Sequence, residues 1–425
     1  MKIVLVHNRY REAGGEDVVF ESERRLLEGA GHQVIAYERS NAELRDDSVI
    51  ARIAIVPRML WSSEIRHEFA KVLDAVRPDI VHVHNTFMRI TPSIYSACTE
   101  RGIPVVQTLH NFRLLCPGGN FYRHGVTCRD CVDRNLLQSV RHGCYRDSRG
   151  ATAAVALMLA FHRALETYPK SVTRFITLTK FAKAEFVAAG FPAEQFVVKP
   201  NFYGQDPGER TGKTGNTEYA LFIGRLMENK GPRVLLNAWK KLRLPCSLQI
   251  VGDGPDRERL ETEARASKLS AVTFHGRISR EAVIEAIRGA RFVIVPSVLY
   301  EGFPMCIVES FACGTPVLCS RLGGLAEIVE DGVTGLHFEP GDADDLARTV
   351  EWACARSSEL DRMGRAARIR YETMYTAKQN YALLMDIYEQ ALATIGRQRQ
   401  SLRLPEYRAS GSVEDCNPVA SGDNR

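Results

Sequence analysis

No stretch of this sequence is long and apolar enough to cross a membrane. The longest apolar run, Ala151 to Phe161, is about half of the roughly 20 residues that a membrane-spanning helix requires. The first ten residues, MKIVLVHNRY, hold only four consecutive apolar side chains, too few for the core of a secretory signal peptide. We therefore expect a cytoplasmic chain whose first residues form a buried strand.

The sequence also lacks a strong excess of charge and the context in which disulfides form. Its 425 residues carry a formal net charge of +5, too modest to indicate a nucleic-acid partner. Eleven cysteines without a secretory signal are typical of a reducing compartment, in which thiols stay free or bind metal. At this length, 45% hydrophobic residues are enough to build two hydrophobic cores, so we expect two domains.

Two series of short aliphatic runs predict two α/β domains. In the first series, strands alternate with segments of helical periodicity such as Val18–Leu27. The pattern begins again after the polar, glycine-rich segment Gly204–Glu218. The predicted strands are Ile3–Val6, Gln33–Tyr37, Ile80–Val83 and Val105–Thr108, and then Tyr219–Ile223, Ser247–Val251, Val272–Phe274, Phe292–Pro296 and Pro316–Cys319. This alternation is typical of Rossmann-like domains, in which crossover helices connect the strands of a parallel sheet.

The same pattern sets the predicted domain boundaries. Residues 1–203 form an N-terminal domain, residues 204–218 a linker, and residues 219–375 a C-terminal domain. Helical spacing of apolar residues predicts that residues 376–395 form a helix that packs back on the N-terminal domain. Residues 396–425 are polar with few apolar anchors, which predicts a disordered tail.

Two cations follow the first strand of the C-terminal series. After that strand, the chain turns at Gly224 and reaches Arg225 and Lys230 before a predicted helix, Val234–Leu242. Parallel sheets bind ligands beyond the carboxyl ends of their strands, and helix N-termini attract anions. Both cations are therefore candidates to bind a diphosphate, although two solvated cations in a loop would give the same pattern.

Glycines and acids add to this site. Gly252 and Asp253 follow a second strand, where glycine lets backbone approach a ligand, although Gly-Asp-Gly is also an ordinary turn. Glu301 and Glu309 are separated by seven residues, and a helix is predicted from about Met305. A carboxylate among apolar neighbours is costly to bury without a specific partner, and a ribose diol would be one. A solvent-facing helix glutamate is the alternative. Backbone amides at this helix start can meet an anion or a sugar hydroxyl, around residues Gly302, Phe303, Pro304 and Met305.

These motifs resemble those of glycosyltransferase family four. Glu301 to Glu309 is similar to the E-x7-E signature, and Gly224–Gly231 is similar to the family's arginine-to-lysine phosphate motif. The resemblance covers residues 1 to about 395 and implies the GT-B architecture, two Rossmann-like domains that face each other across a cleft. It implies that the N-terminal domain, residues 1–203, binds the acceptor and that the C-terminal domain, residues 219–375, binds the nucleotide sugar. It also implies that Arg225 and Lys230 neutralise the donor diphosphate. It further implies that Glu309 binds the ribose and that Glu301 contacts the transferred sugar.

The resemblance also implies two site positions in the first half. The loop Gly14–Gly15–Glu16, before a helix that begins around Asp17, is expected near the reaction centre, where the acceptor approaches the donor phosphate. His110 directly follows a strand and matches the histidine that contacts the donor sugar in many related transferases. A flexible connection and a structural histidine are the alternatives. Supporting hydrogen bonds, or purely structural roles, are expected for His82, His84 and Asn85.

Four cysteines fall in one loop-rich insertion, residues 116–144. They are Cys116, Cys128, Cys131 and Cys144. The C-x2-C spacing of Cys128 and Cys131 suits one zinc ion, and the two flanking cysteines would complete a tetrahedral shell. Such a closed shell leaves no open position for catalysis, so we expect a structural zinc in an acceptor-side lid. Free thiols or a redox pair are the alternatives.

The apolar run Ala151–Phe161 leads into a basic segment. His162, Arg163 and Lys170 follow it, and a helix of this character could lie against a membrane that carries a lipid-linked acceptor. An ordinary core helix is the alternative. Peripheral contact with the inner face of a membrane is therefore an expectation that the sequence leaves open.

Together these features and the resemblance predict a hexosyltransferase, and the resemblance implies that it retains the anomeric configuration. It would move a sugar from a nucleoside diphosphate sugar to a hydroxyl of a saccharide or lipid-linked saccharide, in bacterial cell-surface polysaccharide or glycoconjugate biosynthesis. No cofactor is expected for catalysis, because no Asp-x-Asp pair is positioned to hold a diphosphate-bound Mg²⁺. The expected catalytic residues are His110, Arg225, Lys230 and Glu301, and the expected donor-binding residues are Gly15, Gly224, Gly252, Asp253, Gly302, Phe303, Pro304, Met305 and Glu309. A nucleotide-sugar epimerase of similar fold and a non-catalytic nucleotide-sugar-binding protein are the alternatives.

Overall fold

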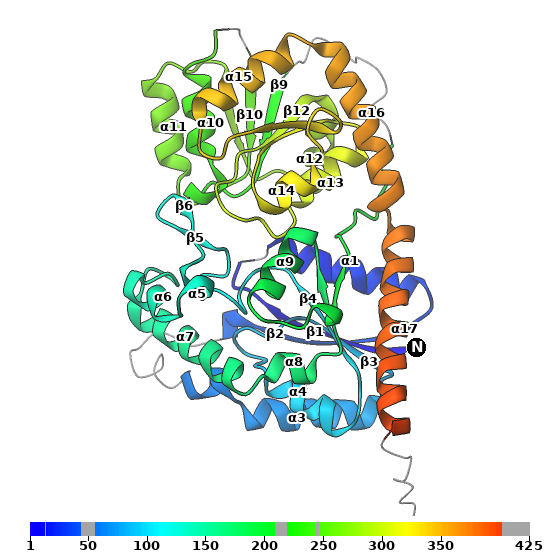
Figure 1. The fold of residues 1–425 in the computed structure, drawn as a ribbon. Helices are drawn as coiled ribbons and strands as arrows, with labels where there is room; N and C mark the ends of the chain where they lie inside the picture. The colour runs from blue at the N-terminus through cyan, green and yellow to red at the C-terminus, as the bar shows by residue number, and fades with distance from the viewer. Residues whose placement is uncertain (13, 44–55, 209–218, 244–245, 402–425) are drawn as a thin grey trace, which may run out of the picture.

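Two parallel sheets form the framework of the molecule, and helices cover both faces of each (Figure 1). The computed structural model describes residues 1–12, 14–43, 56–208, 219–243 and 246–401. Each sheet has six strands, and all strand pairs within the two sheets are parallel. This confirms the predicted fold class of two doubly wound α/β domains.

The N-terminal sheet has the strand order β2-β1-β3-β4-β7-β8. Its strands are β1 (Lys2–Arg9), β2 (Gln33–Ser40), β3 (Ile80–Asn85), β4 (Val105–Leu109), β7 (Arg174–Thr177) and β8 (Phe196–Val198). Its helices are α1 (Gly15–Gly29), α3 (Ser63–Val76), α4 (Ser93–Glu100), α7 (Arg149–Ala164), α8 (Thr167–Ser171) and α9 (Lys180–Ala188). The central strand β1 has Ile3, Val4, Leu5 and Val6 fully buried, because helices pack on both faces of the sheet.

The C-terminal sheet has the order β11-β10-β9-β12-β13-β14, which is the order of a dinucleotide-binding Rossmann fold. Its strands are β9 (Tyr219–Ile223), β10 (Ser247–Val251), β11 (Val272–Gly276), β12 (Ala290–Val295), β13 (Val317–Ser320) and β14 (Gly335–Phe338). Its helices are α10 (Pro232–Trp239), α11 (Arg257–Ala266), α12 (Arg280–Gly289), α13 (Met305–Ala312), α14 (Gly323–Ile328), α15 (Ala343–Cys354) and α16 (Ser357–Met374). The chain order reverses between β9 and β12, and ligands bind at such a switch point in open α/β sheets.

The last helix, α17 (Ala377–Ser401), crosses from the C-terminal domain back to the N-terminal one (Figure 1). Leu384, Ile387 and Tyr388 are buried in one apolar cluster with Ile3 and Leu5 of β1. The helix continues beyond Ile395, so the predicted tail begins later than residue 396. The rest of that tail, residues 402–425, and residues 209–218 of the predicted linker lie outside the described residues.

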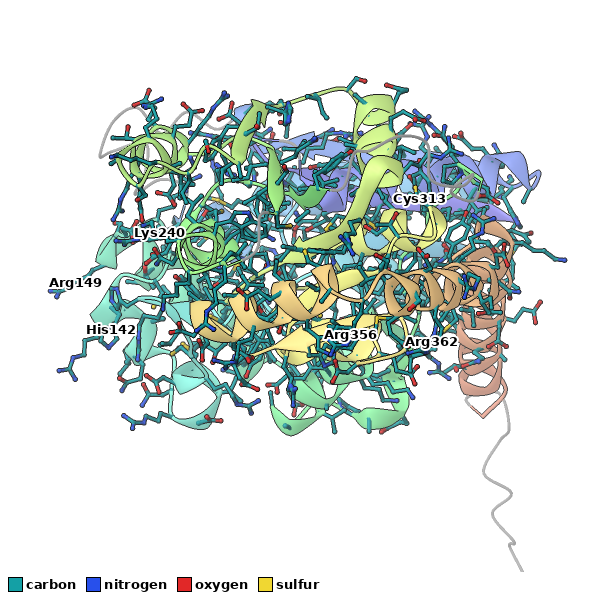
Figure 2. The ribbon with its side chains drawn as sticks, turned by 90° about the horizontal axis from the view of Figure 1, so that it is seen from above. His142, Arg149, Lys240, Cys313, Arg356 and Arg362 are labelled. Atoms are coloured by element: carbon teal, nitrogen blue, oxygen red, sulfur yellow. The ribbon has the colours of Figure 1, made fainter. Side chains whose placement is uncertain are left out.

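The cysteine-containing insertion is an excursion between β4 and α7. It comprises β5 (Tyr122–Arg123), β6 (Val126–Thr127), α5 (Asp130–Asp133) and α6 (Leu137–His142), with β5 and β6 paired as an antiparallel hairpin. His142 of α6 and Arg149 at the start of α7 point outward at the edge of the molecule (Figure 2). None of the helices in the described part of the chain combines the length and apolar character that a bilayer crossing needs.

Candidate active site between the two domains

The loops after β9 and β10 are bonded to each other. The amide of Gly224 donates to the carbonyl of Val251 at 3.0 Å, and the amide of Leu226 donates to that of Asp253 at 2.9 Å. A Cβ atom at Gly252, whose φ is +136°, would lie 1.9 Å from the carbonyl oxygen of Gly224. Gly252 is thus needed for contact between the loops themselves, whereas the sequence explained this glycine by approach to a ligand. Asp253 accepts a hydrogen bond from the amide of Gly254 at 2.8 Å, as in an ordinary turn.

Lys230 lies against Glu301 at the mouth of this turn. Its Nζ donates to both carboxylate oxygens at 2.7 Å, and the hydroxyl of Ser297 donates to Oε1 at 2.5 Å. The Glu301 side chain is only 9% exposed, whereas that of Lys230 is 30% exposed. The buried carboxylate is therefore fully paired, and the accessible ammonium faces the space around it.

Arg225 makes an ion pair across the domain boundary. Its Nη2 lies 2.7 Å from Oε2 of Glu12, which belongs to the loop between β1 and α1. Both side chains are largely exposed, with 48% and 62% of their surface open to solvent. A pair so exposed contributes little to stability, so the guanidinium is available to another anion.

Glu309 lies within α13 and is nearly buried, with 12% of its side chain exposed. Its Oε1 is 3.4 Å from Nη2 of Arg280, and burial raises the pKa of this carboxyl group. Phe303 points into the apolar core, where its ring lies 5.9 Å from that of Tyr375. Pro304 occupies the N-cap of α13 and Met305 is its first residue; the helix has no side-chain cap, which leaves first-turn amides for a ligand.

His110 brings the first domain to the same place. A Cβ atom at Gly302 would lie 2.2 Å from the carbonyl oxygen of His110, so the two domains touch backbone to backbone here. The Nε2 atom of His110 is 3.0 Å from Nδ1 of His84, and the two rings are stacked. The pKa of His110 lies well below its usual value, mainly because the ring is buried and to a lesser extent because His84 is close. The ring of His110 is therefore neutral.

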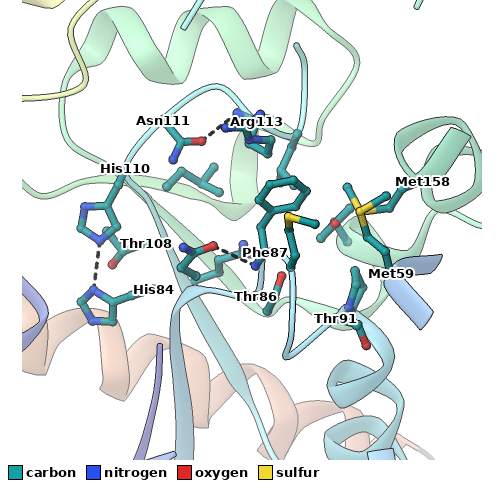
Figure 3. Close-up of a pocket in the computed structure, with 17 residues that line it drawn as sticks. Met59, His84, Thr86, Phe87, Thr91, Thr108, His110, Asn111, Arg113 and Met158 are labelled. Carbon is teal, nitrogen blue, oxygen red and sulfur yellow. Dashed lines mark hydrogen bonds between the residues drawn. The ribbon is translucent and has the colours of Figure 1, made fainter. Parts of the chain in front are cut away.

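A small cavity of about 40 Å³ adjoins His110 on the N-terminal side (Figure 3). Asn111 and Arg113 line it on one side, and Met59 and Met158 on the other. Its volume suits a few water molecules or one small polar group, and a sugar ring would not fit.

The loop before α1 also faces this region. Gly15 is the first residue of α1, and a Cβ atom at either Gly14 or Gly15 would meet no atom within 4 Å. Glu16 is mostly buried, and Asn111 donates to its Oε2 at 3.4 Å. Burial, followed by the adjacent Asp17, raises the pKa of Glu16 to about 8. The structure thus places a carboxyl group that is largely protonated at neutral pH beside the space that the two glycines leave open.

The four insertion cysteines approach one another as free thiols. Cys116 and Cys131 are buried, and a hydrogen bond from Cys131 lowers the pKa of Cys116 to about 6. In a tetrahedral zinc shell with bonds of about 2.3 Å, sulfur atoms stand roughly 3.8 Å apart. Among the described residues, Glu23, His82 and His84 are the one group of three potential metal ligands whose ligand atoms all lie within 4.8 Å of one another. No three of the insertion thiols lie that close together, so the four thiols are farther apart than in such a shell. The zinc site stays a prediction.

The structure adds residues that the sequence did not single out. Glu12, Ser297 and Arg280 each contact one of the predicted charged residues. Ser297 precedes Glu301 by four residues in the loop between β12 and α13, whereas Glu12 and Arg280 come from elements distant in the sequence from their partners. The helical spacing of Glu23 with Phe20 and Leu27, by contrast, is a signal in the sequence, since it places a carboxylate on the buried face of α1.

Comparison with known families covers both domains. Residues 13–203 match the model of Glycosyltransferase Family 4, and residues 208–370 match that of Glycosyl transferases group 1. These matches support a glycosyltransferase of family four. The two matched segments follow each other along the chain and together extend over nearly all of the two α/β domains.

Similar proteins agree with this assignment. The chain is 31% identical over 233 residues to a lipopolysaccharide 1,2-N-acetylglucosaminetransferase of Salmonella typhimurium, which covers 50% of this chain and 61% of that enzyme. It is 26% identical to an uncharacterised glycosyltransferase of Methanocaldococcus jannaschii, over 83% of this chain and 88% of that one. The chain thus spans less than two thirds of the length of the Salmonella relative.

Solved structures establish the architecture. HepE of Anabaena in complex with UDP superimposes with a TM-score of 0.65 at 16% identity, covering 93% of this chain and 100% of that one. The chain therefore has the GT-B fold, with the site residues above at the facing edges of its two domains.

Proposed function

We propose that this chain is a retaining glycosyltransferase that moves a sugar from a nucleoside diphosphate sugar to an acceptor hydroxyl. One observation carries the proposal: Lys230 and Glu301 of one domain lie beside Gly302, whose backbone abuts the carbonyl of His110 in the other. A reaction centre at this contact has a cation for a leaving phosphate and a neutral imidazole from the facing domain.

The donor is proposed to bind the C-terminal domain. Arg225 and Lys230 would bind the diphosphate, which replaces their present partners Glu12 and Glu301. Glu309, nearly buried and 3.4 Å from Nη2 of Arg280, would accept hydrogen bonds from the ribose hydroxyls. The UDP bound to the similar HepE structure supports a nucleoside diphosphate as ligand.

A same-face reaction suits this set of residues. The bond between the anomeric carbon and the donor phosphate oxygen breaks, and a bond from that carbon to the acceptor oxygen forms on the same face. The acceptor proton passes to the departing diphosphate. Arg225 and Lys230 stabilise the negative charge that develops there. Electrostatic stabilisation of this kind is usually the largest single contribution to the rate of an enzyme. We propose no cofactor for this step.

The acceptor is proposed to be a saccharide used in bacterial cell-surface polysaccharide or glycoconjugate synthesis. A relative that transfers N-acetylglucosamine in lipopolysaccharide supports this class of acceptor. A lipid-linked acceptor at a membrane surface is the finer form of the proposal. Its support is that α7 leaves Leu157 53% exposed and Phe161 38% exposed.

The proposal is tested in two steps. A panel of nucleoside diphosphate sugars is first screened by thermal shift, since a bound donor raises the melting temperature. The best donor is then incubated with saccharide acceptors, and the anomeric configuration of the product is read by NMR. Transfer with retention is the expected result. A change of the donor sugar without any acceptor would instead indicate an epimerase, and binding without turnover a non-catalytic protein.

Glu12 competes with the donor diphosphate for Arg225, so Glu12→Gln is expected to tighten UDP binding. An exposed ion pair is worth roughly 0.2–1 kcal/mol, which corresponds to a decrease in Kd of about 1.4- to fivefold. Isothermal titration calorimetry with UDP measures it. Glu43→Gln, which removes another exposed carboxylate paired with Arg89, serves as the control and should leave Kd unchanged. Unchanged or weaker binding by Glu12→Gln would rule out the competition.

We also propose that the insertion cysteines hold a structural zinc ion once the metal draws the four thiols together. Metal analysis of the purified protein should find about one zinc per chain, which is the content of one four-sulfur shell. Cys128→Ser is expected to lose it, whereas Cys354→Ser in the other domain should keep it. Protein without zinc from a zinc-supplemented preparation would end this proposal.

A further inference from the structure

A network of buried polar side chains lies directly behind His110. It joins three parts of the N-terminal domain to α17, and nothing in the fold alone requires it. Its members are Glu23 of α1, His82 and His84 of β3, Lys199 after β8, and Asn380 and Tyr388 of α17. All of them are at most 3% exposed. Polar groups are rarely placed so deep, because an apolar set of the same size would be at least as stable.

The charges in this network balance each other. Lys199 Nζ donates to Oε2 of Glu23 at 2.9 Å and to Oδ1 of Asn380 at 3.0 Å. Burial acts to raise the pKa of Glu23, but the ammonium of Lys199 and the neighbouring His82 hold it well below its usual value. Glu23 is therefore a carboxylate at neutral pH, and Asn380 ties the pair to α17.

A metal ion is a poor alternative to this pairing. The ligand atoms of Glu23, His82 and His84 lie within 4.8 Å of one another, a spacing that a metal could bridge. However, the ammonium of Lys199 already contacts the same carboxylate, and it would repel a divalent cation placed beside it. His82 is also engaged elsewhere, with Tyr388 and Thr108 each 2.8 Å from one of its ring nitrogens.

The carboxylate fixes the direction of the contacts that lead to His110. Oε1 of Glu23 lies 3.3 Å from Nε2 of His84. A negatively charged oxygen this close attracts an N–H and repels a lone pair, so Nε2 of His84 carries the proton. Burial, followed by His82, lowers the pKa of His84 to about 4, so this ring is neutral and its Nδ1 is a lone pair. His110 must then donate from Nε2 to Nδ1 of His84, across 3.0 Å.

We infer that Glu23 and His84 are positioning residues that hold His110 in its Nε2–H tautomer, leaving its Nδ1 as a hydrogen-bond acceptor at the domain contact. In Figure 3 the other ring nitrogen of His110 is turned away from His84. Given the function proposed above, the group that Nδ1 receives is a hydroxyl of the transferred sugar. Glu23 thus acts through His84 and His110 to select the orientation of the sugar hydroxyl that the site accepts.

The tautomer is measured directly by long-range ¹H–¹⁵N NMR of histidine-labelled protein. The His110 signals are assigned from their absence in His110→Gln. In the unsubstituted protein Nε2 should be protonated and Nδ1 should show the downfield ¹⁵N shift of an unprotonated nitrogen. Glu23→Gln should mix or reverse the two states, because an amide can also donate to His84. A His110 protonated at Nδ1 in the unsubstituted protein would overturn the inference, even if Glu23→Gln does not fold.

Activity supplies a second readout that a merely structural role would not move. Glu23→Gln is expected to lower kcat about tenfold or more with an unchanged Kd for UDP, and Glu23→Asp should restore part of it. Glu28→Gln removes an exposed carboxylate from the same helix and is the control. If neither the unsubstituted protein nor any of its variants transfers sugar, the proposed function fails while the tautomer result stands. If transfer is normal in Glu23→Gln, the positioning role itself is wrong.

Discussion

Lys230→Ala is expected to lower kcat for sugar transfer about 100- to 1,000-fold, the range seen when one preorganised donor to a developing charge is removed. The ammonium is the one cation that touches both oxygens of the nearly buried Glu301 carboxylate among the residues that the structure describes. Its loss removes the positive charge that would face the leaving diphosphate. It also leaves an acid that Ser297 alone hydrogen-bonds. Initial rates at saturating donor measure the effect.

A matched control separates charge loss from damage to the fold. Lys240 lies on the same domain, is exposed, and pairs with Glu263 at 2.6 Å (Figure 2). Lys240→Ala should keep normal turnover. Lys230→Arg should recover only part of the activity, since a planar guanidinium replaces a compact charge. Near-normal transfer by Lys230→Ala would remove Lys230 from the proposed mechanism.

Gly302→Ala is expected to reduce kcat by about 100-fold, because a displacement of about 1 Å at a reaction centre can cost that much. The added Cβ would lie 2.2 Å from the His110 carbonyl oxygen, and backbone on both sides of the contact cannot move aside as a flexible side chain would. The two domains must therefore separate. Binding of UDP should change little, since the proposed contacts to the nucleoside diphosphate all come from the C-terminal domain.

This prediction is checked by measuring kcat and the Kd for UDP in the same variant. Gly150→Ala is the control, since a Cβ atom there would meet no atom within 4 Å and the residue lies in α7. Full activity in Gly302→Ala would show that the close approach of His110 and Gly302 is not needed for transfer. Loss of UDP binding would instead show a local disruption of α13.

Much of the framework could be predicted because its strands are apolar runs that alternate with segments of helical periodicity. Tyr219–Ile223 and Ser247–Val251 form β9 and β10 with the predicted bounds. The strands β7, β8 and β14 were not predicted, since they have three or four residues and some begin or end in polar side chains. The predicted helix Val234–Leu242 instead spans Pro232–Trp239, because proline is favoured at the first helical position.

The site could be predicted only where a motif is local in the sequence. Arg225, Lys230 and Glu301 lie in such motifs, and the structure brings Lys230 and Glu301 into contact. The partners from other elements could not be predicted, since contact between Lys199 and Glu23 spans 176 residues of sequence. Such a pair is created by the packing of α1, β8 and α17, and no spacing rule describes it.

The most direct test of the proposed donor site is a crystal structure of the chain with the nucleoside diphosphate that stabilises it most. Diphosphate oxygens within hydrogen-bond distance of both Arg225 and Lys230, with Glu12 displaced, is the predicted result. A diphosphate bound elsewhere, with Arg225 still paired to Glu12 and Lys230 to Glu301, would contradict it.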